Sequence, residues 1–120
     1  RSKIWNLYFY ELAEWAKQNN VKIPNLTKQS LHPNHLFYLI FPSKKKLKHF
    51  ILYMKQKKIQ VATHYLSLNK SKFYKTSHNK DITLINAESF SERLVRLPLY
   101  YNLNLTNQKQ IINEIIKYDV

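Results

Sequence analysis

The sequence predicts an α+β domain in which a small sheet of about three strands is covered by helices. Stretches with the apolar spacing of a helix alternate along the chain with short stretches typical of strands. The chain has 120 residues, 44% of them hydrophobic and 14% aromatic, which suits one folded domain with a real core. No apolar run approaches the roughly 18 residues that a membrane-spanning helix needs. We therefore expect one domain over residues 1–120 with no membrane segment.

The first half of the chain predicts a helix, a strand and a second helix. Residues 2–19 carry an apolar stripe at helical spacing, formed by Ile4, Trp5, Tyr8, Leu12, Trp15 and Ala16. Residues 35–41 are almost wholly apolar and end at Pro42, so we expect a strand covered on both faces, at the centre of the sheet. Ser43 can cap the next helix, which ends near Lys57.

The second half predicts a strand, a loop, a short helix, an extended segment and a last helix. Apolar and polar residues alternate over 59–65, as in a strand, and residues 69–83 are polar and irregular, as in a mobile loop. A short helix over about 87–94 leads into residues 97–101, whose internal proline restricts them to an edge strand or an extended segment. Thr106 can cap the last helix, whose buried stripe is Ile111, Ile112, Ile115 and Ile116.

The charge of the chain is strongly positive, with 20 Lys and Arg against 7 Asp and Glu, a net charge of +13. Such an excess attracts phosphates, and three explanations stay open: nucleic-acid binding, a phosphorylated small substrate, or composition drift in a lysine-rich proteome. The densest cluster, residues 44–46 with Lys48, falls on the polar side of a helix, where solvation alone explains it. A nucleic-acid module would use Phe37 and Tyr38 for base stacking, and a bare interaction domain would dock through the aromatic face of the first helix.

The chain contains neither Gly nor Cys. Phosphate-cradling Gly-rich loops are therefore excluded, and the missing Cys fits a reducing cytoplasm. Turns and helix ends must use asparagine where other proteins use glycine. The candidates at breaks in the patterns are Asn19, Asn20, Asn69, Asn79, Asn102 and Asn104.

Metal and nucleophile sites are not predicted. His32 and His35 have ligand-like spacing, but Pro33 lies between them and neither Cys nor a tight carboxylate cluster could complete a site. Nothing resembles a nucleophile elbow, and Asp81 and Asp119 lie in a loop and a tail, so we assign no catalytic residue.

Four motifs occur together and in order along the chain. They are Arg1-x-x-Ile4-Trp5-x-x-Tyr8, Asn34-His35-Leu36-Phe37-Tyr38, His64-Tyr65 and Ser91-Glu92-Arg93-Leu94-Val95-Arg96-Leu97-Pro98-Leu99-Tyr100-Tyr101-Asn102-Leu103. With them the chain resembles the C-terminal domain of the DegT/DnrJ/EryC1/StrS sugar aminotransferases. Any one of these motifs is weak evidence for the family, but four of them in register over nearly the whole chain are specific evidence for it.

The resemblance implies the C-terminal small domain of a fold-type-I pyridoxal-phosphate (PLP) transferase. Such an enzyme moves an amino group from glutamate to a 4-keto-6-deoxy nucleotide sugar for surface polysaccharides such as lipopolysaccharide, with active sites at a homodimer interface. In this family the Schiff-base lysine and the PLP pocket lie in a large domain that precedes the small one. Because the chain begins at Arg1 without Met, inside a helical pattern, we expect a fragment that holds no cofactor, is inactive alone and self-associates.

The resemblance also suggests which residues face the substrate. His64 and Tyr65, at the end of a predicted strand, would contact the nucleotide sugar, and Arg96 could hold an anionic group through its planar fork. The sequence departs from the family pattern where Ser67 stands in place of Pro and Asn69 in place of a second His. The substrate can therefore differ from that of relatives.

Overall fold

The structure is a computed structural model and describes residues 1–26, 33–63, 65–77 and 82–120. Its elements are helix α1 (Ser2–Gln18), strand β1 (Phe37–Ile40), helix α2 (Lys44–Gln56), strand β2 (Ala62–Thr63), the 3-10 turn η1 (Leu68–Lys70), helix α3 (Lys72–Ser77), helix α4 (Ile85–Arg93), strand β3 (Leu94–Leu97) and helix α5 (Leu105–Ile116). The strands form one antiparallel sheet of three strands. The predicted α+β class with a three-stranded sheet is confirmed.

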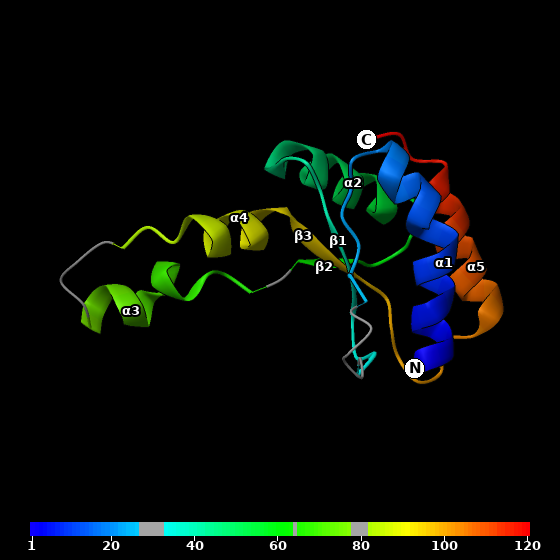
Figure 1. Cartoon of the computed structure of the whole chain (residues 1–120), viewed down its shortest axis with the longest axis horizontal. Coiled ribbons are helices and arrows are strands. Elements are labelled where there is room, and N and C mark those ends of the chain that lie inside the picture. The colour runs from blue at the N-terminus through cyan, green and yellow to red at the C-terminus, as the bar shows by residue number, and fades with distance from the viewer. Residues whose placement is uncertain (27–32, 64, 78–81) are drawn as a thin grey trace.

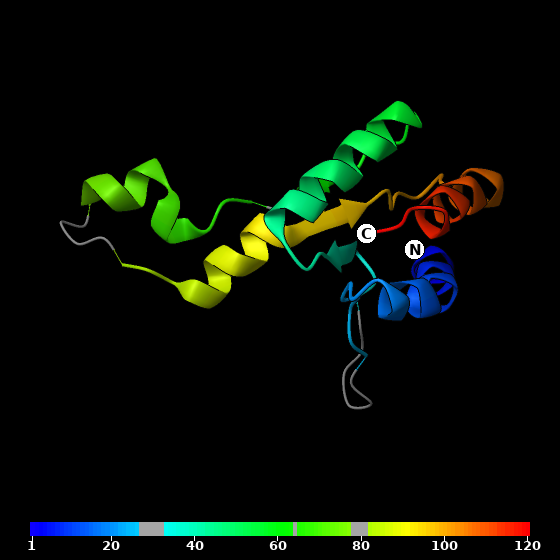
Figure 2. The same ribbon diagram turned by 90° about the horizontal axis from the view of Figure 1, so that it is seen from above.

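The molecule consists of a packed body and a projecting arm (Figures 1 and 2). In the body, α1 and α5 lie side by side at one end, and α2 runs past the sheet. The arm comprises the described residues between β2 and β3, with η1, α3 and α4. It extends the molecule to 50 × 35 × 28 Å. No helix in the described ranges is long and apolar enough to cross a membrane.

The order of the strands is β1-β3-β2, so β3 is central. The prediction that the strand within 35–41 is central was wrong, and so was the assignment of residue 94 to a helix. Pro98 follows the last residue of β3 and therefore removes no ladder hydrogen bond. β1 is nonetheless buried, because its apolar side chains join the core and Ile40 forms an isolated bridge with Lys22 on its outer side.

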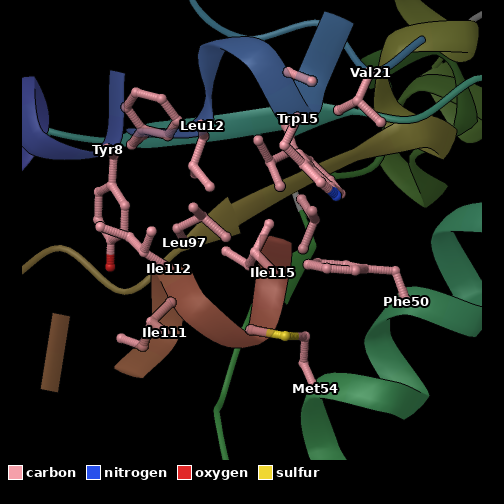
Figure 3. Close-up of a cluster of buried hydrophobic side chains, with 14 of the residues drawn as sticks. Tyr8, Leu12, Trp15, Val21, Phe50, Met54, Leu97, Ile111, Ile112 and Ile115 are labelled. Atoms are coloured by element: carbon pink, nitrogen blue, oxygen red, sulfur yellow. The ribbon is translucent and has the colours of Figure 1, made fainter. Parts of the chain in front are cut away.

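The core lies between α1, α5, α2 and one face of the sheet (Figure 3). Side chains of α1 point toward the isoleucines of α5, with Leu97 of β3 between them and Phe50 and Met54 of α2 alongside. Full burial of an apolar side chain stabilises the fold by about 1.5–3 kcal/mol. The largest fully buried side chains are Trp5, Tyr8, Phe37, Phe41, Phe50, Leu12, Leu39, Met54, Ile115 and Val95.

The buried aromatic residues of α1 also anchor distant parts of the chain through their polar atoms. Trp15 Nε1 donates a hydrogen bond to the Tyr118 carbonyl at 2.8 Å, and the Tyr8 hydroxyl donates to the Pro98 carbonyl at 2.9 Å. Trp5 Nε1 donates to the carbonyl of residue 36 at 3.0 Å. The first helix thus fixes the start of β1, the end of β3 and the C-terminus.

Two helices end in left-handed residues other than glycine. Asn20 (φ 53°) follows α1 and Lys58 (φ 60°) follows α2. In both turns the next residue donates a hydrogen bond five residues back, from Val21 to Ala16 at 2.8 Å and from Ile59 to Met54 at 2.9 Å, as in a Schellman motif. Asparagine was expected at such a place, whereas lysine was not.

Of the two helix N-caps predicted from the sequence, the one of α2 is confirmed and the one of α5 is not. Ser43 caps α2 by accepting a hydrogen bond from the backbone nitrogen of Lys46 at 3.2 Å, as expected. The expectation that Thr106 caps α5 was wrong, because Asn104 accepts from the Asn107 nitrogen at 2.7 Å instead. The segment expected to be an irregular loop contains η1 and α3 in its described part.

Candidate substrate-binding site

The candidate site lies on the face of the sheet opposite the core. In the antiparallel register, Arg96 pairs with Tyr38 on one side and with Ala62 on the other. Neighbouring residues of a strand point to opposite faces, and Val95 and Leu97 belong to the core. The row Tyr38–Arg96–Ala62 therefore projects from the outer face, where Arg96 is half-buried.

Arg96 and Tyr65, two of the residues expected to face substrate, lie against each other. The Arg96 guanidinium carbon is 5.6 Å from the centre of the Tyr65 ring, within the range of a cation–π contact. Its Nη2 donates a hydrogen bond to the Thr63 carbonyl at 3.4 Å. Arg96 Nε is buried and has no hydrogen-bond partner among the described residues. This nitrogen is therefore unpaired among the described residues and also closed to solvent.

The third expected residue, His64, lies outside the described residues. Its chain neighbours Thr63 and Tyr65 are both exposed, with Tyr65 at 76%. The structure therefore brings Tyr65 and Arg96 together and leaves the position of His64 as a prediction.

The two departures from the family pattern, Ser67 and Asn69, are both buried within the arm. The Ser67 hydroxyl donates a hydrogen bond to the Asn69 side-chain oxygen, and the Asn69 side-chain nitrogen donates to Glu88 Oε1 at 2.6 Å and to the Ile82 carbonyl at 2.7 Å. All three contacts join parts of the arm to one another. These two side chains brace the arm in this protein.

A groove of about 720 Å³ opens beside Arg96. It is formed by three segments far apart in sequence, residues 57–62, residues 96–103 and the start of α5, together with residues 35 and 36. Its lining mixes polar and apolar residues, and its cationic lining groups are Arg96, Lys57 and Lys58. The described lining contains no carboxylate. Sequence reasoning missed this groove, because no local pattern reports which distant segments meet.

The three cations of the groove differ in how far they are neutralised. Lys57 Nζ lies 3.1 Å from Glu114 Oε2, and this contact raises the pKa of Lys57. The ammonium groups of Lys57 and then Lys117, with the hydroxyl of Tyr53, lower the pKa of Glu114. Among the described residues no carboxylate pairs with Lys58 or Arg96. These two remain for an anion.

The described residues do not gather the ligands of a metal ion. No group of three or more His, Cys, Asp or Glu gathers within the described ranges. A PLP site combines a Schiff-base lysine with an Asp or Arg partner for the pyridine nitrogen. The groove offers Lys57, Lys58 and Arg96, without any carboxylate in its described lining.

The fold is shared with solved aminotransferases of bacteria. The structure matches the aminotransferase TlmJ from Streptoalloteichus hindustanus with a TM-score of 0.82 at 16% identity, covering 97% of this chain and 30% of that protein. It matches a putative sugar aminotransferase, Spr1654, from Streptococcus pneumoniae (TM-score 0.80, 21% identity, 96% and 29% covered). It also matches Helicobacter pylori PseC, an aminotransferase of pseudoaminic acid biosynthesis (0.72, 22%, 96% and 32%).

The chain thus spans about three tenths of the length of these proteins. The sequence profile of the DegT/DnrJ/EryC1/StrS aminotransferases matches it over residues 1–116, which is nearly its whole length. This protein chain therefore belongs to the DegT/DnrJ/EryC1/StrS aminotransferase family.

Proposed function

We propose that this chain is the C-terminal small domain of a PLP-dependent nucleotide-sugar aminotransferase. In the whole protein, an amino group would pass from glutamate to the keto carbon of a 4-keto-6-deoxy nucleotide sugar, leaving 2-oxoglutarate. The subgroup we propose is dTDP-4-amino-4,6-dideoxygalactose transaminase, acting in the cytoplasm in the synthesis of surface polysaccharides such as lipopolysaccharide. The large domain that would hold PLP would then lie outside these 120 residues.

The observation that carries this proposal is the family match over residues 1–116. The solved neighbours support PLP as the cofactor of the whole protein, since Spr1654 has PMP and PLP forms and Bacillus subtilis NtdA was solved with bound PMP. The specific sugar is proposed from the motifs of the sequence.

The residues that would face the sugar nucleotide are His64, Tyr65 and Arg96. Tyr65 presents an exposed ring beside the Arg96 guanidinium, so the pair offers an aromatic surface next to a cation. Such a pair suits a ligand with a planar base or sugar ring and a nearby phosphate. His64 would supply a further polar group from the same strand end.

The arm supports docking onto another part of the whole protein or its dimer partner. Its exposed large apolar side chains are Tyr65, Leu66, Leu68, Phe73, Ile82, Leu84, Ile85 and Phe90. Exposed apolar patches of this kind commonly mark interfaces. We propose a homodimer for the whole protein, and self-association of the isolated chain at high concentration. A clean monomer in sedimentation at high concentration contradicts the second statement.

The nucleic-acid alternative loses one of its two stacking residues in the structure. Phe37 is fully buried in the core, and only Tyr38 reaches the outer face of the sheet. Base stacking requires exposed rings. A titration of random oligonucleotides at rising salt would still favour that alternative if binding proved tight and steeply salt-dependent.

The proposed function is tested with a longer protein, in which the coding sequence upstream of Arg1 is expressed together with residues 1–120. We expect glutamate-dependent amination of a 4-keto-6-deoxy nucleotide sugar, followed as 2-oxoglutarate release. His64→Ala should lower kcat/KM more than about tenfold, a loss of about 1.4 kcal/mol of transition-state stabilisation, while His49→Ala, on the exposed face of α2, serves as the matched control. A loss of tenfold or less for His64→Ala contradicts its assignment, and a protein without transaminase activity contradicts the function.

A further inference from the structure

The exposed side of α2 carries lysines and no acidic residue. Residues 44–58, which comprise α2 and the turn after it, contain seven lysines and neither Asp nor Glu. Two of these lysines form ion pairs, one with Glu92 at 2.9 Å and one with Glu114 at 3.1 Å. Three others are exposed and pair with no carboxylate among the described residues: Lys48, Lys55 and Lys58.

Aliphatic side chains lie between these lysines on one face of α2. Lys48, Ile51, Leu52 and Lys55 follow the spacing i, i+3, i+4, i+7, so they share a face of the helix. Leu52 is 58% exposed and Ile51 is half-buried, whereas the residues of α2 that join the core lie on another face. α2 lies at the outer edge of the body, so this face is open to solvent (Figure 2).

A second groove, of about 350 Å³, continues this face beyond the end of α2. It is lined by Ile51, Lys55, Lys58, Ile59, Gln60 and Val61. Three of its six lining residues are aliphatic, and its only charged ones are lysines. We call the face of α2 and this groove together the lysine–aliphatic strip. Solvation explains its lysines, but it does not explain an apolar surface that runs between them over two helical turns.

The composition of the lysine–aliphatic strip favours a membrane surface over a protein or a nucleic acid. Lysine is depleted at protein interfaces, whose centres use aromatic residues and arginine, and the strip contains neither. Base stacking requires rings, which the strip also lacks. Lysines beside aliphatic side chains suit the boundary of a bilayer, because their stems cover apolar surface while their ammonium groups reach lipid phosphates.

We propose that the lysine–aliphatic strip docks reversibly on a membrane surface that contains anionic phospholipids. The ammonium groups of Lys48, Lys55 and Lys58 contact lipid phosphates, and Leu52 enters the region just below them. Each lysine near such a surface strengthens binding severalfold, so several together give reversible attachment. The inference goes beyond the proposed function, because it requires neither a substrate nor a cofactor.

The test is sedimentation of the 120-residue chain with vesicles at one fixed ionic strength. One set contains phosphatidylcholine alone, and the other contains roughly one third phosphatidylglycerol. Sedimentation without vesicles corrects for self-associated chain. We expect binding to the anionic vesicles only, weakening as salt is raised.

Two pairs of substitutions separate a local site from general attraction. Lys48→Gln with Lys55→Gln should weaken binding to anionic vesicles about tenfold. Lys17→Gln with Lys109→Gln removes the same charge from exposed positions of α1 and α5 and should weaken it less than about threefold. Leu52→Ala, at an exposed position, should weaken it about threefold without changing the thermal midpoint.

Four results overturn the proposal. Equal losses in the two double variants show diffuse attraction to a chain of charge +13. Unchanged binding by Leu52→Ala shows that no apolar side chain enters the bilayer. Tighter binding to a double-stranded oligonucleotide or to polyglutamate, lost in the Lys48→Gln and Lys55→Gln double variant, assigns the strip to a nucleic acid or to an acidic protein.

The fourth result comes from the longer protein that tests the proposed function. If that protein no longer binds the vesicles, the lysine–aliphatic strip is covered in it, and the proposal fails while the transaminase activity stands. Vesicle binding by a longer protein without transaminase activity has the opposite meaning, because it supports the strip and contradicts the proposed function.

Discussion

The Asn69 side-chain nitrogen donates a hydrogen bond to Glu88 Oε1 at 2.6 Å and so ties η1 to the first turn of α4. The same carboxylate oxygen accepts the backbone nitrogen of Leu84 at 3.0 Å, and the other lies 3.2 Å from Lys70 Nζ. The arm contributes few side chains to the core, so its internal order depends on this small polar network. Asn69 is the buried centre of it, at 4% exposure.

Asn69→Ala should loosen the arm without unfolding the body. The change removes two donated hydrogen bonds and leaves Glu88 and the Ile82 carbonyl without that partner. We expect amide hydrogen exchange over residues 84–90 to accelerate about tenfold, because such local opening is governed by local free energy. Asn113→Ala, at an exposed position of α5, is the control. Unchanged exchange in the arm would refute the bracing role.

The acid stability of the chain should depend on Glu88 and Glu114. Hydrogen bonds from the Leu84 nitrogen and then from Asn69 lower the pKa of Glu88, and Lys57 and then Lys117 lower that of Glu114. A carboxyl with a lowered folded pKa stabilises the fold above its unfolded pKa and loses this contribution as the pH falls through the folded value.

Stability should therefore hold near neutral pH and decline below about pH 4.5, the ordinary value for glutamate. Glu114→Gln should reduce that decline, because the amide does not titrate. Urea unfolding of both proteins at several pH values between about 3 and 7 measures this decline in stability. A decline of the same size in the variant would show that other carboxyls are responsible.

Much of the fold was predictable because it is encoded locally. The apolar stripes of α1, α2 and α5 repeat at helical spacing, and Ser43 carries the side chain that a helix start needs. The strand order was not predictable in this way. β3 is only four residues long and follows α4 without a break, and its central place arises from pairing with two distant strands.

The candidate site was likewise predictable only in part. The motifs identified Tyr65 and Arg96, and the structure places the Arg96 guanidinium carbon 5.6 Å from the Tyr65 ring centre. The groove beside Arg96 also needs residues of the segment 57–62 and of α5, which lie in none of the motifs. The alternation over 59–65 predicted a long strand, but among the described residues of that range only Ala62 and Thr63 pair with β3.

Lys58→Gly should stabilise the fold by about 1 kcal/mol. A side chain in the left-handed region costs roughly 1–2 kcal/mol, and glycine avoids that cost, although its unfolded chain is freer. The matched variant Lys55→Gly, in the last turn of α2, should destabilise by about 1 kcal/mol instead. Urea unfolding of both variants checks the opposite signs. Two variants with the same sign would contradict the Schellman turn.

Tyr8→Phe should destabilise the chain by about 1–2 kcal/mol, because the carbonyl of half-buried Pro98 would lose its donor. Burial, together with the neighbouring Tyr100, raises the pKa of Tyr8, so its hydroxyl stays a donor over the ordinary pH range. Tyr10→Phe, whose side chain is 73% exposed, should change stability by less than about 0.5 kcal/mol. Equal effects of the two changes in urea unfolding would show that the bond to Pro98 contributes nothing.

In the proposed function, the PLP half of the active site is supplied outside these 120 residues. The direct measurement is an absorbance titration of the purified 120-residue chain with PLP, repeated with the protein extended by its upstream coding sequence. We predict no stoichiometric binding by the chain alone and one tightly held PLP per extended chain. Stoichiometric PLP held by the 120 residues alone, or an extended protein that takes up none, would contradict the account.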